Sequence, residues 1–154
     1  MIQRKQTLFL LLAALLVLST WLFPIATYQS TAETYELMTY GLYTADGVKV
    51  TDADLKMPFS ILLSLLALAL VIAIFLYSNR PRQMRFVRGS YLLMLAIIAF
   101  MFITDNSVGA YLEGAERTFG LSFVMPLVAL VLTVMAERGI RADEKLVRSM
   151  DRLR

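Results

Sequence analysis

Four long apolar stretches alternate with charged ones along the chain and predict an all-α membrane protein. The uncharged stretches are LFLLLAALLVLSTWLF, PFSILLSLLALALVIAIFLY, SYLLMLAIIAFMFI and GLSFVMPLVALVLTVMA. A helix needs about 20 residues to cross a bilayer core of roughly 30 Å. A helix of a soluble bundle would carry a polar stripe for water, and these stretches show no such stripe. We therefore expect a single domain, residues 1–154, with four transmembrane helices at about 7–27, 58–77, 86–104 and 119–137.

Two of the four stretches need a further argument. The third reaches the required length only if Phe86 and Val87 belong to it and Arg88 extends its guanidinium back to the head groups. The first begins like a signal peptide, because Arg4 and Lys5 precede an apolar run. That run continues past position 21 without a clear cleavage site, so we interpret it as a membrane anchor.

The charges of the connecting segments predict the orientation of the chain. Most of the 15 Lys and Arg residues lie in the N-terminal tail, in SNRPRQMRFVRG and after position 137, whereas residues 28–57 and 105–118 are acidic. Basic segments are retained in the cytoplasm. Both termini and the middle connection are therefore predicted to be cytoplasmic, and residues 28–57 and 105–118 to form outer loops. This arrangement requires an even number of spans and corresponds to a multi-pass membrane protein.

The first outer loop contains a local signal for a β-hairpin. Asp46-Gly47 lies between runs rich in tyrosine, threonine and valine, and this dipeptide favours a two-residue hairpin turn. We expect strands near Glu36–Thr44 and Val48–Thr51. Because an isolated hairpin is only marginally stable, we expect it to pack on the helix ends or on the other outer loop. In that second loop we expect at most a short helical fragment at Tyr111–Arg117.

Aromatic residues are also found near the predicted ends of the spans. They are Trp21, Phe23, Tyr28, Tyr77 and Tyr91. Amphipathic rings commonly anchor a helix at the membrane–water interface, and we assign these residues that structural role.

The sequence offers little chemistry for catalysis. It contains no cysteine and no histidine, and the four apolar stretches contain no charged residue. The polar groups at depth are hydroxyls, which commonly bond to their own or a neighbouring helix. A serine nucleophile requires a base, and no lysine or carboxylate is expected at the same depth. We therefore predict a protein that is not an enzyme, with no catalytic, metal-binding or cofactor-binding residues.

Two cytoplasmic features are candidates for binding. The first is the segment RPRQMRFVR, which gathers Arg80, Arg82, Arg85 and Arg88 at the membrane surface. Each basic residue near an anionic leaflet contributes roughly 1 kcal/mol of attraction. The simplest interpretation is a topology determinant that also binds lipid phosphates.

The second feature is the C-terminal tail, residues 138–154, which is predicted to form an amphipathic helix. On a helical projection, one side is basic and the opposite side apolar. The basic side holds Arg138, Arg141, Lys145, Arg148 and Arg152, and the apolar side holds Leu146, Val147, Met150 and Leu153, with Ile140 at its margin. Glu137–Arg141 and Glu144–Arg148 are acid-before-base pairs that support a helix. The fourth span is expected to continue into this helix or to bend at Gly139.

Such a tail has three potential partners. It can lie among anionic lipid head groups with its apolar side down, or place that side in the groove of a partner protein of a membrane complex. It can also turn its basic side to an RNA phosphate backbone, as at a ribosome. Lipid is the first expectation, a partner protein the second and nucleic acid the least favoured.

The two ends of the chain resemble a known family. MIQRKQTLFLLLAALL and RADEKLVRSMDRLR are similar to the ends of the domain of unknown function 4293 family, small four-helix membrane proteins of Bacteroidota. The resemblance covers the whole chain, and its diagnostic part is Asp143-Glu144, then residues 146–149, then Asp151-Arg152. It implies an inner-membrane location and no particular activity. Glu137 and Gly139 depart from the family pattern, which favours a bend at this junction.

Several functional hypotheses follow. The first is an accessory or scaffold subunit that contacts a cytoplasmic partner or anionic lipid through the arginine segment and the tail helix. The second is a small channel or transporter for ions or small solutes, with a pore between protomers lined by Ser60, Ser64 and Ser122. A sensor that responds through the outer hairpin is a third. The oligomeric state is not indicated by the sequence.

Overall fold

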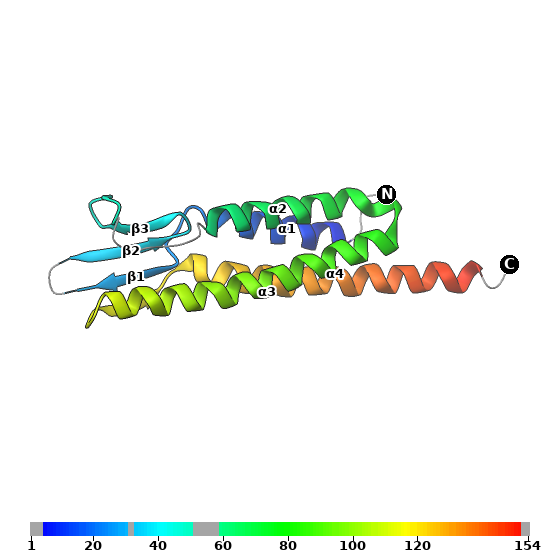
Figure 1. Ribbon diagram of the computed structural model, residues 1–154. Helices are drawn as coiled ribbons and strands as arrows, with labels where there is room; N and C mark the ends of the chain where they lie inside the picture. The colour runs from blue at the N-terminus through cyan, green and yellow to red at the C-terminus, as the bar shows by residue number, and fades with distance from the viewer. Residues whose placement is uncertain (1–4, 31–32, 51–58, 152–154) are drawn as a thin grey trace.

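Helices dominate the computed structural model, which describes residues 5–30, 33–50 and 59–151 (Figure 1). The four α-helices of this part of the chain are α1 (Lys5–Ser19), α2 (Phe59–Phe75), α3 (Arg80–Tyr111) and α4 (Leu121–Asp151), and the 3-10 turn η1 (Leu76–Ser78) follows α2. Helix α1 packs on α2 and α4, and α3 packs on the same two helices. The start of α1, the end of α4 and the α2–α3 connection lie at one end of the bundle, here called the tail end, and a sheet lies at the other, the sheet end (Figure 1).

The helices are apolar outside as well as inside. Leu10, Leu63 and Met94 are completely buried in the core, whereas Leu8 and Ile103 are more than half exposed on the outer surface. Within the described residues, α2 with η1, α3 and most of α4 are long and apolar enough to cross a membrane, and α1 is a shorter apolar helix of 15 residues. An exterior this apolar is typical of a membrane protein, because so large an apolar surface is unfavourable in water.

A four-stranded antiparallel sheet covers the sheet end. Its strands are β1 (Ala26–Gln29), β2 (Thr34–Met38), β3 (Gly41–Thr44) and β4 (Glu116–Phe119), in the order β3-β2-β1-β4. Tyr28 in the central strand β1 pairs with Tyr35 on one side and with Arg117 on the other. The sheet therefore joins the two segments that were predicted to be separate outer loops.

The predicted hairpin is correct in its turn and wrong in its strands. The Asp46-Gly47 turn forms, with Gly47 at a φ of 78°, and the Thr44 amide donates to the Val48 carbonyl at 2.9 Å. The predicted strand 36–44, however, is divided by a tight turn at residues 39–40 into β2 and β3. Residues after the turn pair with β3 through an isolated bridge, and position 51 lies outside the described residues. Strand β4 was not predicted, because its pairing with β1 joins segments about ninety residues apart. Strand β1 was not predicted, because its first two residues were assigned to the first span.

Helix α3 is longer than the predicted range 86–104 in both directions. It begins at Arg80, because the Asn79 side chain accepts a hydrogen bond from the Arg82 amide at 3.3 Å and Pro81 occupies the first turn. Both features favour a helix start. The arginine segment is therefore helical and not a loop. At its other end α3 continues through the predicted outer loop to Tyr111, so the helical fragment predicted at 111–117 is wrong and residues 116–119 form β4 instead.

Helix α4 continues from the apolar bundle into the charged tail without interruption. The predicted tail helix is therefore confirmed as far as Asp151, and the helix continues through Gly139. Glycine at this position permits close packing, because a Cβ atom there would lie 2.7 Å from Cγ of Gln6 in α1. The bend that was expected as an alternative at Gly139 is therefore absent, and this residue forms a helix contact instead.

A close crossing of the chain at the sheet end joins the start of α4 to the segment after α1. The Gly120 amide donates to the Ile25 carbonyl at 2.8 Å, and a Cβ atom on Gly120 would lie 2.0 Å from the Pro24 carbonyl oxygen. The Ser122 hydroxyl lies 2.8 Å from the Thr20 carbonyl oxygen and 2.6 Å from that of Phe23. These carbonyls follow the last turn of α1, where no helical partner is available. The start of α4 therefore supplies hydrogen-bond donors to the backbone carbonyls that follow α1.

We predict that Gly120→Ala strongly destabilises the protein, because the methyl group would collide with backbone atoms that cannot rotate away. The matched control is Gly89→Ala, an exposed position in α3 with no atom within 4 Å of the added carbon. That substitution should be neutral or stabilise by up to about 1 kcal/mol, since alanine favours a helix over glycine. Thermal unfolding in detergent measures both. Equal unfolding temperatures for the two variants would contradict the close crossing.

Candidate functional site at the tail end of the bundle

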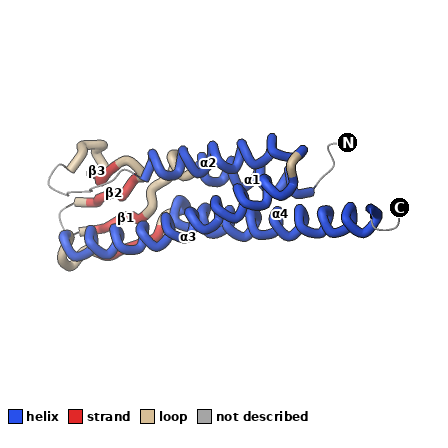
Figure 2. The backbone as a smooth tube through the Cα atoms, turned by 45° about the vertical axis from the view of Figure 1, so that its right-hand side comes forward, coloured by secondary structure: helices blue, strands red, loops and turns tan. Residues whose placement is uncertain are grey.

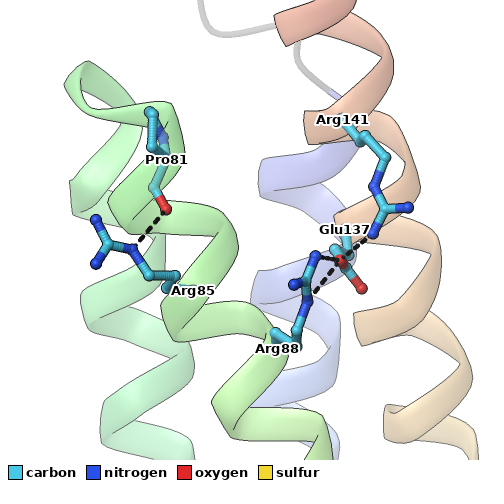
Figure 3. Close-up of polar contacts among 5 residues, drawn as sticks. All are labelled: Pro81, Arg85, Arg88, Glu137 and Arg141. Atoms are coloured by element: carbon cyan, nitrogen blue, oxygen red, sulfur yellow. Dashed lines mark hydrogen bonds and ion pairs between the residues drawn. The ribbon is translucent and has the colours of Figure 1, made fainter.

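The tail end contains a buried carboxylate held by two arginines. The Glu137 side chain, in α4, is only 8% exposed. Its Oε1 atom accepts hydrogen bonds from Arg88 of α3, at 2.8 Å from Nη2 and 3.2 Å from Nε, and from Nη2 of Arg141 at 2.7 Å. Figure 3 shows Glu137 between the two guanidinium groups. We call these three residues the Glu137 cluster.

The cluster explains why a charge is tolerated so close to apolar helix surface. A buried carboxylate is costly unless it is paired and hydrogen-bonded. Arg88 was expected to extend to the head groups, but it reaches across to α4 and supplies this pairing. The predicted Glu137–Arg141 pair within α4 is also present. Two positive groups and one negative group leave the cluster with a net charge of +1.

Further polar contacts join the other helices at the same end. The Gln6 side chain of α1 donates to Asp143 Oδ2 of α4 at 2.7 Å. The Gln83 side chain of α3 donates to the Ala73 carbonyl of α2 at 2.9 Å. Together with the Glu137 cluster, these contacts connect all four helices at the tail end.

The remaining arginines of the predicted site do not join the cluster. Arg82 is exposed on the first turn of α3, and Arg80 is partly buried there. Arg85 donates through Nε to the carbonyl of Pro81 at 3.4 Å, and Figure 3 shows it turned away from Glu137. The four arginines of the predicted segment therefore do not form one surface. Arg88 meets Arg141 of α4 at Glu137, and the other three lie nearer the start of α3.

The tail beyond the cluster changes from packed to exposed. Ile140 is buried against the bundle, whereas Leu146 is 64% exposed and Val147 is 38% exposed. Lys145 is exposed as well. This last part of α4 extends past the other helices (Figure 2).

For four residues of the predicted tail site, the structure describes no side chain. Arg148 and Met150 lie on α4, but their side chains are not described. Arg152 and Leu153 lie outside the described residues altogether. The Glu144–Arg148 pair therefore stays a prediction.

A second buried cluster lies at the sheet end. Asp105 in α3 is completely buried. Its Oδ1 atom accepts a hydrogen bond from the Tyr28 hydroxyl of β1 at 2.5 Å, and its Oδ2 atom accepts one from Nη1 of Arg117 of β4 at 2.7 Å. We call these three residues the Asp105 cluster. Burial raises the pKa of Tyr28 far above its usual range, and its contact with Asp105 adds to the effect. Tyr28 therefore remains a protonated hydrogen-bond donor.

Sequence reasoning missed this second cluster. Asp105 was assigned to an outer loop and Tyr28 to the membrane interface, because a charge was taken as the end of the third span. A signal was nevertheless present: Asp105 follows the buried Met101 by four positions and precedes the buried Val108 by three. That spacing keeps all three on one face of a helix.

Both clusters can hold secondary-structure elements together, and the Glu137 cluster also presents guanidinium groups to the outside. Within the described residues, no group of three or more histidine, cysteine, aspartate or glutamate side chains is placed to hold a metal ion.

We predict that Asp105→Asn destabilises the protein by about 2 kcal/mol, because the completely buried side chain at position 105 would lose its charge-assisted hydrogen bond with Arg117. The charge-matched control is Glu116→Gln on β4, which is exposed and should change stability by less than about 0.5 kcal/mol. Denaturant unfolding of the detergent-solubilised protein measures both effects. If the control lost as much stability as Asp105→Asn, the cluster would not be what holds the sheet.

Comparison with known proteins places the chain in a family. The family model described as "Domain of unknown function (DUF4293)" matches residues 2–153. No curated protein matches the chain. The matched region includes the four helices, the sheet and both buried clusters. The resemblance carried by the two ends of the sequence is therefore confirmed, and the chain belongs to the DUF4293 family of domains of unknown function.

Proposed function

We propose that this protein is a four-span protein of a bacterial inner membrane and serves as a non-enzymatic accessory or scaffold subunit. Its tail end would contact a cytoplasmic partner protein, with anionic lipid as a second ligand. One observation carries the proposal: α4 runs unbroken from the apolar bundle into a charged, exposed segment, at the same end of the bundle as the arginine-rich start of α3.

The spacing of the two buried clusters supports the membrane placement. Arg88 and Asp105 both lie on α3, seventeen positions apart, and no charged residue separates them. At a rise of about 1.5 Å per residue, these positions are about 26 Å apart along the helix, close to the roughly 30 Å of a bilayer core. On α4 the stretch from Leu121 to the residue before Glu137 is equally free of charge. The clusters would therefore mark the two faces of the membrane.

Helix α1 also fits the proposed membrane placement, although it is short. Its 15 residues span about 22 Å, which is less than the bilayer core. The turn that follows it adds exposed apolar surface, with Leu22 75% exposed and Trp21 43% exposed. These residues would complete the first crossing near the outer head groups, where a tryptophan ring is favoured.

The distribution of charge supports the orientation. Lys5, Arg82 and Arg138 come from three separate segments, and the fold gathers all three segments at the tail end (Figure 1). Basic residues are retained on the cytoplasmic side. We infer that the tail end faces the cytoplasm and the sheet faces outward.

The direction of the tail favours a partner protein over the membrane surface. From Asp143 to Asp151 the helix advances about 12 Å beyond its contact with Gln6. Because this segment continues the axis of α4, under the proposed placement it would point away from the bilayer and would not lie in the head-group plane. Leu146 and Val147 are exposed on it, and an exposed apolar pair on a helix is suited to a groove in another protein.

The alternative of a channel receives less support. The Ser64 hydroxyl donates to the Ser60 carbonyl at 2.7 Å, and the Thr133 hydroxyl donates to the Ala129 carbonyl at 2.7 Å. The Ser122 hydroxyl is engaged with carbonyls that follow α1. Hydroxyls used in this way commonly stabilise helices and their ends, so these bonds favour a structural role for them over the lining of a pore.

We predict that Leu146→Glu, or a chain ending at Glu144, loses a stoichiometric protein partner that co-purifies with the wild type in mild detergent. The matched control is Val48→Glu at the sheet end, because Val48 and Leu146 are equally exposed, at 64% each. The control should retain the partner. The same set of partners for all variants would exclude the tail from the function.

A further inference from the structure

The Glu137 cluster presents two guanidinium groups around a single atom. Nη2 of Arg88 and Nη2 of Arg141 lie 2.8 Å and 2.7 Å from the same carboxylate oxygen. Arg88 comes from α3 and Arg141 from α4, so the carboxylate fixes two side chains that would otherwise be independent. Paired arginines at a fixed separation are preorganised to bind a planar or tetrahedral oxyanion.

The carboxylate lies beneath the two arginines and does not cover them. The Glu137 side chain is 8% exposed, against 49% for Arg88 and 63% for Arg141. The described bonds to Glu137 use two N–H groups of Arg88 and one of Arg141, and a guanidinium has five such donors. The exposed side of the pair therefore presents donors and a net positive charge to the surroundings.

Other basic residues strengthen the field around the pair. Arg138 precedes Arg141 by three positions and Lys145 follows it by four, so all three lie on one face of α4 and are exposed. On α3, Arg85 precedes Arg88 by three positions and is also exposed. Of the nearest acids, Asp143 is engaged with Gln6 on the side of α1.

The position of Arg88 and Arg141 on the bundle indicates which class of anion they would bind. Deeper along both helices the outer surface becomes apolar: Leu92, four positions after Arg88 on α3, is 56% exposed, and Met135, six positions before Arg141 on α4, is 44% exposed. The pair thus lies where apolar surface meets charged surface, which is the depth of lipid head groups under the proposed membrane placement. A lipid bound there could place its phosphate on the arginines and its acyl chains along Leu92 and Met135.

We propose that Arg88 and Arg141 form a binding site for the phosphodiester of an anionic membrane lipid, with Glu137 as the residue that positions them. The inference rests on the proposed membrane placement, but it does not depend on a protein partner of the tail. A soluble phosphate would use the same donors, but it would gain nothing from the apolar surface below them.

The test is equilibrium binding to the full-length protein in a neutral detergent, followed by native mass spectrometry. The probes are phosphatidylglycerol, phosphatidylcholine and inorganic phosphate. Wild-type protein should bind phosphatidylglycerol most tightly. Arg141→Gln should weaken that binding by at least about tenfold, because a charge-assisted hydrogen bond is lost. The matched control Arg82→Gln removes the same charge from the exposed start of α3 and should weaken it by no more than about fivefold, the contribution of general surface attraction.

Two further variants separate the possible explanations. Arg141→Lys keeps the charge and removes the planar fork, so it should bind phosphatidylglycerol less tightly than wild type if the geometry matters. Leu146→Glu should bind the lipid normally even where it loses a protein partner, so failure of one proposal is distinguishable from failure of the other. Unfolding temperatures verify that each variant is folded.

Three results would overturn the proposal. Equal losses for Arg141→Gln and Arg82→Gln would indicate a diffuse charge effect and no site. Equal binding of phosphatidylglycerol and phosphatidylcholine would show that the negative charge of the lipid is not recognised. Inorganic phosphate bound as tightly as phosphatidylglycerol would assign the pair to a soluble ligand.

Discussion

The pairing of Glu137 with Arg88 and Arg141 is the interaction on which the tail end depends. An uncompensated carboxylate among apolar helices would be strongly unfavourable, so the helices must bring at least one arginine to it. Arg141 comes from the same helix, but Arg88 comes from α3 and therefore fixes α3 against α4. The charged tail is a direct continuation of α4. Its direction is therefore the direction that α4 has within the bundle.

At the sheet end, too, a buried carboxylate must be paired, but its partners there are a tyrosine and one arginine. Asp105 is buried in α3, and its partners Tyr28 and Arg117 come from two neighbouring strands. The carboxylate therefore holds the sheet on the helix, as Glu137 holds one helix on another. Because α3 carries a member of each cluster, this one helix connects the two ends of the molecule.

The two ends differ in what they offer to other molecules. At the sheet end the buried acid is enclosed, and Arg117 is used to neutralise it. At the tail end two arginines share one acid, so positive charge remains on the outside, and exposed apolar residues lie on both sides of it along the chain. Leu146 belongs to the projecting helix, and Met135 belongs to the surface proposed to face lipid. The tail end thus has the two surfaces that the proposals use, one for a partner protein and one for an anionic lipid.

The sequence by itself determined the four apolar helices, the gathering of basic residues into three segments and the continuation of the last helix into the tail. These features depend on local periodicity and on charge, which are visible in neighbouring residues. Only the tertiary structure decided that Arg88 pairs with Glu137, that Asp105 is buried, and that β1 and β4 are neighbours. Each of these contacts joins residues far apart in the chain, and a charge buried on an apolar helix is stable only when a partner from another element pairs with it. The local sequence shows that a charge lies among apolar residues and is costly to bury. It does not show which distant residue pairs with that charge, because the fold brings the two together.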